Sequence, residues 1–558
     1  QYDAIVIGGG PAGSVITKLL SDDSWRRVLL IEAGDASQHA LGGTDAIDSP
    51  LNSGNLTAFD VPYFWTRVAN TPELHWDYPD VNVAKALGGC GIHNGMLYVR
   101  AIPEDLSNWA MKSWTWEKAM QLYVNMEDYN GPDEAYHGKG GIVRTSMPAV
   151  QDDVSEKFIE ACVSVGLPRS PDFNAPGGRY GAGYYHFNTR NGVRDSAART
   201  FLGPLLQPGQ ERANLKLMLN TKVAKIDLNQ AGTAATGVTI HREDDNSTRT
   251  VRLAKHGQVI LTAGAINTPK VLLLSGIGDP HDLSVLGIPT KRVNSRVGVN
   301  LQDHPVLGMT FKSLSQSPIN IDDDLARYFK ARENEDENPT SYGRMGSSGI
   351  SVGAFLIPPG STIPGIQLTF FPQKSEPHLS NSRELNHTSE VLVTVALLTP
   401  EARNRVVLTS SDHHASPRVV PEVPEGNTEH LSGSDVWKLS WGVRVVREIM
   451  ADSSLADVVG PELTPGPAVV TDEDLNKWIY GAVFRNSHWV GSASMGHSER
   501  NGVVDHRLRV FGIPNLRVAD ASVIPVIPNG NVHSSVLMVA SHAAQLIKED
   551  EQPEFKEE

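Results

Sequence analysis

The chain has 558 residues, too many for a single ordinary domain of about 100–200 residues. Its composition, 40% hydrophobic and 20% charged, is that of a globular protein, and no apolar run approaches the ~20 residues that span a bilayer. A formal net charge of −15 repels phosphate backbones and argues against nucleic acid as a partner.

The first 32 residues predict a nucleotide-binding βαβ unit. Residues 2–7 read as a buried parallel strand, residues 12–21 as a helix, and residues 28–31 as a second strand that ends at Glu32. The turn between them has the pattern G-x-G-x-x-G, whose glycines permit a tight turn, close approach of a pyrophosphate and helix packing. We therefore assign a dinucleotide to Gly8, Gly10, Pro11, Ala12, Gly13, Glu32 and Ala33.

The elements that follow are less regular. We expect long loops over residues 34–70 and a helical stretch over residues 102–128. Further on, two strands at residues 215–219 and 258–262 flank an antiparallel hairpin near residues 222–254. From residue 306 to 475, short strand-like runs such as 366–371 and 391–398 alternate with Pro-rich turns, which indicates an antiparallel sheet.

Two further segments carry specific motifs. Residues 84–100 read Ala-Lys-Ala-Leu-Gly-Gly-Cys-Gly-Ile-His-Asn-Gly-Met-Leu-Tyr-Val-Arg, and residues 264–278 read Gly-Ala-Ile-Asn-Thr-Pro-Lys-Val-Leu-Leu-Leu-Ser-Gly-Ile-Gly. They resemble the two signatures of the glucose–methanol–choline (GMC) oxidoreductases, a family that uses FAD. Residues 297–304 and 508–525 also resemble family segments, so the resemblance runs from residue 2 to about residue 547.

The resemblance implies an α/β fold, α+β overall, with a Rossmann-type FAD-binding domain. Into it is inserted a substrate domain built on an antiparallel sheet with helices. We expect the FAD-binding domain to comprise residues 1–148, 187–305 and 476–548, and the substrate domain residues 149–186 and 306–475. Residues 549–558 are charged and poorly patterned, so we predict a disordered tail.

The resemblance also implies further contacts with FAD. These fall on Gly88, Gly89, His93, Asn94, Gly95, Met96, Val223, Asp520, Ala521 and Asn531. The loop departs from the commonest family form at Cys90 and His93, and there it is most like the choline oxidase branch, whose histidine is bonded to the flavin 8α-methyl group. Two interpretations of His93 therefore stay open: it is covalently bonded to the flavin, or it only forms hydrogen bonds within the loop.

A histidine and an asparagine are the predicted catalytic pair. Loss of hydride from an alcohol requires removal of the hydroxyl proton, a task suited to imidazole. By resemblance, His488 is this base and Asn531 its partner, with His533 as a competing candidate two residues further on. Other histidines, including His304 and the pair His413–His414, read as structural or exposed, and no spacing indicates a metal.

The expected activity is oxidation of a small alcohol to an aldehyde or ketone by hydride transfer to flavin N5. Dioxygen, giving hydrogen peroxide, or another acceptor then reoxidises the flavin. The alternative is a hydroxynitrile lyase of the same family, in which FAD is not turned over. The sequence does not identify which alcohol is oxidised. We identify no combination of an aromatic cage and a carboxylate that would bind a quaternary ammonium group.

Weak features favour secretion. The chain starts at Gln1 without an initiator Met, and the triplets at Asn55, Asn246 and Asn386 fit glycosylation acceptors. The two cysteines, Cys90 and Cys162, are too few for a disulfide framework.

Overall fold

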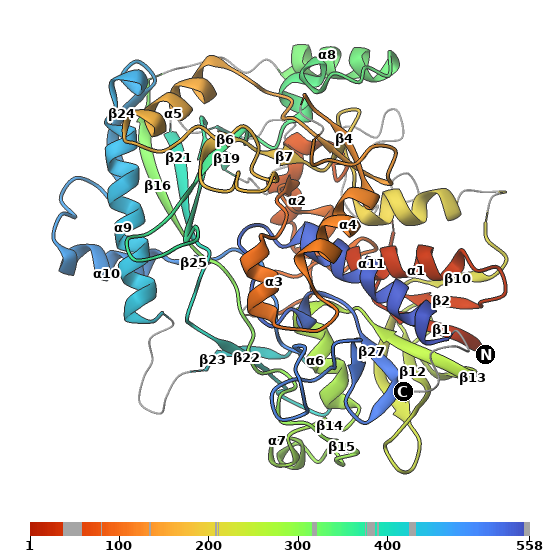
Figure 1. Cartoon of the computed structure of the whole chain (residues 1–558). Helices are drawn as coiled ribbons and strands as arrows, with labels where there is room; N and C mark the ends of the chain where they lie inside the picture. The colour runs from red at the N-terminus through yellow and green to blue at the C-terminus, as the bar shows by residue number, and fades with distance from the viewer. Residues whose placement is uncertain are drawn as a thin grey trace.

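The computed structural model describes residues 1–36, 58–79, 81–132, 135–206, 209, 211–314, 321–373, 375–376, 386–387, 390–422 and 431–551. Two large sheets, one of eight strands and one of seven, organise the chain and occupy different parts of the molecule (Figure 1). The first carries the glycine turn, and the second is antiparallel and covered by helices. The expected fold class, a Rossmann-type domain with a second sheet-based domain, is confirmed.

The eight-stranded sheet runs in the order β10–β2–β1–β13–β12–β11, with β27 beside β13 and β26 beside β27. Its parallel part consists of β10, β2, β1, the end of β13 and β27. All of β2 and the last four residues of β1 are buried, as expected for strands covered on both faces. The strands are β1 (Tyr2–Ile7), β2 (Val28–Ile31), β10 (Leu215–Met218), β11 (Thr221–Leu228), β12 (Ala235–Arg242), β13 (Ser247–Leu261), β26 (Arg509–Val510) and β27 (Ile513–Val518).

β13 differs from the prediction. We expected a hairpin near residues 222–254 and a separate strand at 258–262, but residues 247–261 form one strand. Its first part pairs antiparallel with β12, and its last part pairs parallel with β1 and β27. At the junction His256 has a φ of 67° and the register with β1 shifts, so a bulge bends the strand and does not end it.

The helices of the nucleotide-binding half pack around this sheet. α1 follows the glycine turn and lies along α11, the last helix, while α6 packs against β11 (Figure 1). The predicted helix at 102–128 is two helices, because Ala110 adopts a left-handed φ of 54° that ends α3, and Thr115 then caps α4. The bounds are α1 (Pro11–Ser21), α2 (Trp65–Ala69), α3 (Pro103–Trp109), α4 (Trp116–Met126), α6 (Gly264–Leu274), α7 (Pro280–Val285) and α11 (His533–Asp550). A further helix, α8 (Ile321–Glu333), lies away from this sheet at the top of the view in Figure 1.

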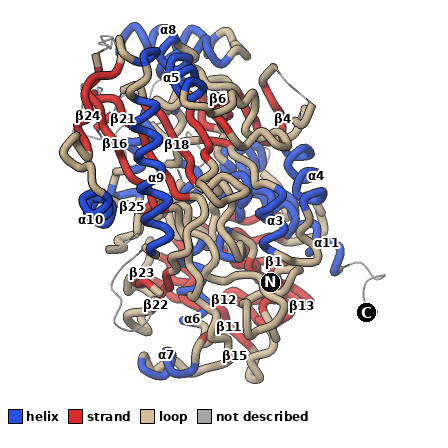
Figure 2. Tube along the Cα trace, turned by 60° about the vertical axis from the view of Figure 1, so that its left-hand side comes forward, coloured by secondary structure: helices blue, strands red, loops and turns tan. Residues whose placement is uncertain are grey.

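The seven-stranded sheet runs in the order β24–β16–β21–β18–β17–β6, with β25 also paired to β16. One face is covered by α9 and α5, which contact each other, and α10 packs beside α9 (Figures 1 and 2). The elements are α5 (Asp153–Ser164), α9 (Gly433–Met450), α10 (Asp472–Ala482), β6 (Gly181–Tyr184), β16 (Pro305–Ser313), β17 (Val352–Leu356), β18 (Ile366–Phe371), β21 (Glu390–Leu397), β24 (Val459–Thr464) and β25 (Phe484–Arg485).

Alternate side chains of β18 lie on opposite faces of the sheet, so this strand contributes both to the hydrophobic core and to the cavity described below. Ile366, Leu368 and Phe370 point into the helix-covered core, where the Phe370 ring stacks on Phe158 with centroids 4.4 Å apart. The intervening Gln367 and Thr369 point to the other face, toward the nucleotide-binding half. A strand's period of two residues separates the two roles.

The chain also forms smaller sheets. A four-stranded sheet has the order β3–β7–β5–β4, and four other pairs are two-stranded. Their strands are β3 (Leu97–Tyr98), β4 (Glu127–Asn130), β5 (Val143–Ser146), β7 (His186–Phe187), β8 (Thr189–Arg190), β9 (Val193–Arg194), β14 (Ile277–Gly278), β15 (Arg292–Val293), β19 (Ser375–Glu376), β20 (Asn386–His387), β22 (Asn404–Val407) and β23 (Arg418–Pro421). None of the helices described is long and apolar enough to cross a bilayer.

The domain division read from the sequence needs three adjustments. The boundary at residue 476 falls inside α10, which packs on α9 and belongs with the second sheet. β22 and β23 lie within the expected substrate segment but pack against α6 of the nucleotide-binding half. The predicted tail at 549–558 is wrong at its start, because α11 continues to Asp550 and Glu551 pairs with Arg26; residues 552–558 lie outside the described part.

Of the three predicted glycosylation acceptors, the structure describes the side chain of Asn246 alone. Asn246 is exposed in the turn between β12 and β13, where it has a φ of 49°. Asn55 lies outside the described residues, and so does the side chain of Asn386.

Candidate active site

One cavity of about 600 Å³ joins the two halves of the molecule. It extends from Glu32 at the end of β2 to His488 in the loop after β25, and one wall comes from β18 and β21. Most of the predicted site residues line it: Gly8, Gly10, Pro11, Ala12, Glu32, Ala33, Gly89, His93, Asn94, Gly95, Met96, Val223, His488, Asp520, Ala521 and Asn531.

The remaining predicted residues, Gly13 and Gly88, do not line the cavity but support the two glycine loops that do. A Cβ on Gly13 would lie 1.8 Å from the Gly8 carbonyl oxygen, so only glycine lets α1 pack this closely on the turn. Gly88 has a φ of 100°, and its N–H donates to the Gly9 carbonyl over 2.8 Å. This bond holds the second glycine loop against the first.

The glycine turn has the features of a dinucleotide cradle. Gly10 is the N-cap residue of α1 and has no side chain, so the first N–H groups of the helix are not consumed by a capping side chain. Gly10 lies next to Gly89, whose Cα would be 3.9 Å from a Cβ at Gly10. A helix N-terminus of this kind binds the phosphates of a dinucleotide.

Glu32 occupies the position predicted for a ribose-binding carboxylate. It is buried, and its two oxygens accept from the N–H groups of Gly9 (2.7 Å) and Gly34 (2.8 Å). Burial raises the pKa of Glu32, and these hydrogen bonds oppose that rise. The carboxylate is thereby fixed at the cavity edge beside Ala33.

The second glycine loop is fixed by an arginine that the sequence reading missed. Arg194 is buried and donates to the carbonyl and to the side-chain oxygen of Asn94, both at 2.7 Å, and to the Phe59 carbonyl. Asn94 Oδ1 also accepts from the N–H of Met96, which has a φ of 63°. These hydrogen bonds fix the backbone conformation of residues 93–96, which line the cavity.

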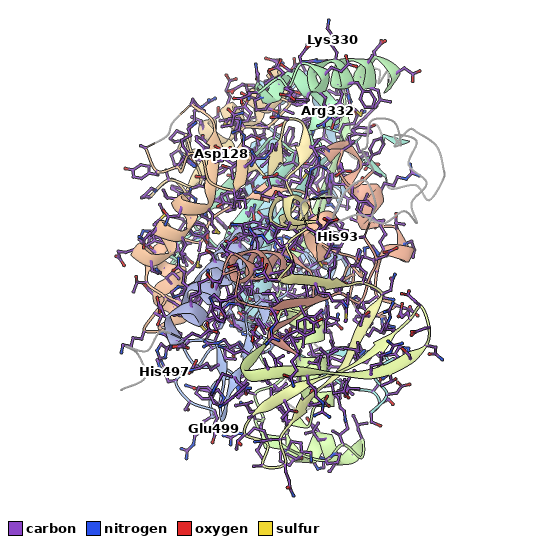
Figure 3. The ribbon with its side chains drawn as sticks, turned by 90° about the vertical axis from the view of Figure 1, so that its right-hand side faces the viewer. His93, Asp128, Lys330, Arg332, His497 and Glu499 are labelled. Carbon is purple, nitrogen blue, oxygen red and sulfur yellow. The ribbon has the colours of Figure 1, made fainter. Side chains whose placement is uncertain are left out.

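His93 lies in the interior, far from α8 at the edge of the molecule (Figure 3). Its Nδ1 is 3.2 Å from Nε2 of His75, a contact that no sequence motif indicated. Burial, with a contribution from His75, lowers the pKa of His93 to about 3. The ring is therefore neutral, as a nucleophilic imidazole must be.

Asp520 and Ala521 follow β27 and line the cavity near its middle. Asp520 is buried and accepts from the N–H of Gly264 (2.8 Å) and from the hydroxyl of Thr268 (2.6 Å). Burial raises its pKa. The carboxylate thus joins the end of β27 to the first turn of α6, which carries the second family-like segment.

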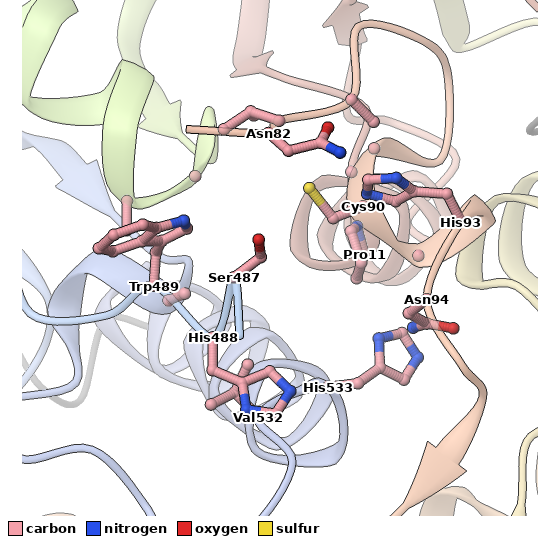
Figure 4. Close-up of a pocket in the computed structure, with 18 of the residues that line it drawn as sticks. Pro11, Asn82, Cys90, His93, Asn94, Ser487, His488, Trp489, Val532 and His533 are labelled. Carbon is pink, nitrogen blue, oxygen red and sulfur yellow. The ribbon is translucent and has the colours of Figure 1, made fainter. Parts of the chain in front are cut away.

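His488 and Asn531 meet at the other end of the cavity. Asn531 Nδ2 lies 3.4 Å from His488 Nε2, a long contact that leaves both atoms accessible to a substrate oxygen. Burial lowers the pKa of His488 to about 4, so this ring is also neutral near pH 7. Figure 4 shows His488 and Trp489 on one side of the pocket, with Cys90 and His93 on the other.

The other ring nitrogen of His488, Nδ1, lies within hydrogen-bonding distance of His304. The two Nδ1 atoms are 2.9 Å apart, and His304 is completely buried. If His488 donates its Nδ1 proton to His304, the lone pair lies on Nε2, which faces the cavity. His304 therefore has a role in the site that we did not assign from the sequence.

Asp303 positions the loop that carries His488. Its carboxylate accepts from the N–H groups of His488 (2.6 Å), His304 (2.8 Å) and Ser487 (3.1 Å). Ser487 has a φ of 60°, a strained conformation for a non-glycine residue that these bonds maintain. Burial raises the pKa of Asp303 to about 7.

Asn531 is oriented from the second sheet. Its Oδ1 accepts from Gln367 Nε2 over 3.1 Å, and Gln367 also donates to the hydroxyl of Tyr185. With its oxygen used in this way, Asn531 presents its NH₂ group toward His488. Gln367 could not be found from the sequence, because its partner is 164 residues away.

His533, the competing candidate, begins α11 and lines the same cavity. It lies beside Asn94 and away from Trp489 in Figure 4, and its ring would be 3.6 Å from a Cβ on Gly91. The structure therefore brings Asn531 to His488 and places His533 against the second glycine loop.

The dinucleotide cradle, the second loop and the His488–Asn531 pair at one cavity end define a flavin-type oxidoreductase. The family models described as GMC oxidoreductase match residues 2–306 with an N-terminal part and residues 400–540 with a C-terminal part. The chain belongs to the GMC oxidoreductase family, binds FAD and acts on CH–OH donors.

Individual relatives cover almost the whole chain. Oxygen-dependent choline dehydrogenase of Staphylococcus xylosus is 31% identical and covers 98% of this chain and 95% of its own length. The chloroplastic fatty acid photodecarboxylase of Chlamydomonas reinhardtii is 28% identical over 98% of this chain and 90% of its own. The solved pyridoxine 4-oxidase from Mesorbium loti shares the fold, with a TM-score of 0.81, 24% identity and coverage of 99% and 100%.

Proposed function

We propose that the protein oxidises a small neutral alcohol to an aldehyde or ketone, with His488 as the base that removes the hydroxyl proton. The observation that carries this proposal is the neutral His488 Nε2 beside Asn531 in the same cavity that the glycine turn lines. Bound FAD supplies the hydride acceptor, and dioxygen, giving hydrogen peroxide, or another acceptor reoxidises it.

In this proposal the protein's own groups prepare the alcohol. Nε2 of His488 accepts the hydroxyl proton, and the Asn531 NH₂ group donates to the alcohol oxygen as negative charge develops on it. The donor is fixed in advance by Gln367, so little reorganisation is needed during reaction. The imidazolium that forms is stabilised by its Nδ1 contact with His304.

The wall contributed by the second sheet supports a neutral substrate. The cavity-lining residues that come from β16, β18, β21 and β25 have apolar or uncharged side chains: Val306, Gln367, Thr369, Phe371, Leu392, Thr394, Ala396 and Phe484. A quaternary ammonium substrate would need a carboxylate here to offset the desolvation of its charge. We therefore favour aryl or aliphatic alcohols over choline, although choline dehydrogenases are relatives.

An anaerobic panel tests the reaction class. Benzyl alcohol, hexanol, glucose and choline are mixed separately with the holoenzyme, and the visible flavin band is followed. We expect bleaching by a neutral alcohol. Cleavage of mandelonitrile with the flavin still oxidised would instead identify the hydroxynitrile lyase, an alternative that the choline and alcohol dehydrogenase relatives do not support.

The electron acceptor is tested with the best alcohol of the panel. Peroxide formation in air and dye reduction without air are measured in parallel on the same enzyme. Faster turnover in air supports an oxidase, and turnover with dye alone supports a dehydrogenase.

Secretion is a separate proposal. Asn246 is exposed in a turn, where a glycan would not disturb the core. Expression in a secreting eukaryotic host, followed by removal of N-glycans, should lower the apparent mass, and Asn246→Gln should reduce that change. An unchanged mass would contradict glycosylation.

A further inference from the structure

Three histidines meet where the β22–β23 loop lies on the nucleotide-binding sheet. His241 comes from β12, and His413 and His414 come from the loop. One ring nitrogen from each lies within 4.8 Å of the other two. The ring of His414 is 4.7 Å from that of His241 and 4.0 Å from that of His413, measured between centroids.

One nitrogen in this cluster has no protein partner. Nε2 of His413 is buried and makes no hydrogen bond with any described residue, which costs free energy unless something else satisfies it. The opposite nitrogen, Nδ1, lies 3.6 Å from a carboxylate oxygen of Asp412. A carboxylate behind a histidine ring is the arrangement that orients metal-binding histidines.

Asp412 also fixes the loop. Its Oδ1 accepts from the N–H of His414 over 2.9 Å, so the backbone between the two loop histidines is held by a side chain of the same turn. The cluster is therefore set by a sheet strand on one side and by a constrained turn on the other.

The charges around the cluster limit which ion it accepts. Lys270 lies nearby over the rings of Trp76 and Tyr78, and its charge opposes a cation, while the carboxylate of Asp412 favours one. Three imidazoles without an oxygen ligand in the group suit zinc and similar transition ions, and not calcium or magnesium.

We propose that His241, His413 and His414 bind one divalent transition-metal ion, with Zn²⁺ as its representative, that fastens the β22–β23 loop to β12. Zinc–nitrogen bonds of about 2.0–2.1 Å place ligand nitrogens about 3.4 Å apart in a tetrahedral site, so modest ring rotations close the observed spacing. His414 is exposed, which leaves the fourth position to water. His413 also lines the cavity that contains the dinucleotide cradle, and the proposed ion takes no part in the oxidation.

Metal content and zinc titration test the proposal. The holoenzyme is dialysed against a chelator, titrated with zinc chloride by calorimetry, and assayed for metal by emission spectroscopy. We expect one zinc per chain. His241→Ala and His414→Ala should each weaken binding by more than the roughly 10–100-fold caused by loss of an outer-shell group.

His497→Ala is the matched control, because His497 is exposed and is not one of the three clustered histidines. It should bind zinc like the unaltered protein, and zinc should raise the melting temperature of both but not of His241→Ala. A protein that binds no zinc, or a His241→Ala variant that binds it equally well, overturns the proposal.

X-ray absorption at the zinc edge gives a readout that does not depend on variants. The unaltered protein loaded with one zinc should show three imidazole nitrogens at about 2.0–2.1 Å. A first shell with thiolate sulfur, or with oxygen and fewer than two imidazoles, would place the ion elsewhere and overturn the assignment.

Discussion

The burial of the His488 ring sets the pH range in which it works as a base. Its ordinary pKa near 6.5 is lowered to about 4 because burial disfavours the charged imidazolium. The neutral ring is the active form. Activity is therefore present above the folded-state pKa and is lost as the pH falls through it.

The first prediction is the acid limb of the pH profile. Measured between about pH 4 and pH 9, kcat/KM for the best alcohol should stay level down to about pH 5 and fall near pH 4. An acid limb centred at or above 6.5 would contradict the assignment of His488 in this environment.

The second prediction separates the two candidate histidines. His488→Ala should lower kcat/KM by about 10²–10⁴-fold, the usual contribution of a general base, with its FAD content unchanged. His533→Ala should lower it far less, because the ring lies against the Gly91 loop and Asn531 is the residue next to His488. A larger effect at His533 would reverse the assignment.

The third prediction concerns the flavin linkage. We expect the yellow colour to stay with the chain after acid precipitation, since the neutral His93 presents Nε2 while Nδ1 contacts His75. In His93→Ala the colour should move to the supernatant. Free flavin from the unaltered protein would show that His93 only hydrogen-bonds within its loop.

At the scale of elements, the glycine turn allows a matched pair of substitutions. Gly13→Ala would bring a Cβ to within 1.8 Å of the Gly8 carbonyl and should prevent α1 from packing, so little folded protein is expected. Gly10→Ala meets only Gly89, at 3.9 Å, and should fold but contain less FAD. Circular dichroism and FAD content per chain distinguish the two effects, and equal behaviour would contradict them.

Local patterns predicted the elements whose partners are close in sequence. The βαβ unit at residues 2–31 appears almost as expected, because glycine chemistry and buried strands determine it locally. β13 was misread because its first half pairs with the neighbouring β12, whereas its last half pairs with β1 and β27 from distant parts of the chain. The roles of Asp303, His304 and Gln367 were not predicted for a similar reason, since only the tertiary fold brings them to His488 and Asn531.

Ion pairs fasten the end of α11 to the nucleotide-binding half of the molecule. Arg26, 2% exposed, makes two hydrogen bonds of 2.7 Å with Glu551 after the last helix, and Arg517 pairs with Asp550. Such a buried guanidinium is costly without its carboxylate.

Glu551→Ala should therefore destabilise the fold by about 2 kcal/mol, less than the 3–5 kcal/mol of a fully buried pair because Asp23 still contacts Arg26. Glu549→Ala, whose pair with Arg507 is more exposed, is the matched control and should change stability little. Urea unfolding followed by tryptophan fluorescence measures both, and equal midpoints would refute the difference.

The cavity between the two halves has a consequence for how the enzyme is made. Its lining begins at Ile7 and ends at Val536, so a nascent chain lacks part of the cavity wall until residue 536 has been synthesised. β27 also reaches its place in the first sheet only then. The complete FAD site therefore cannot form before β27 and the start of α11 have been synthesised.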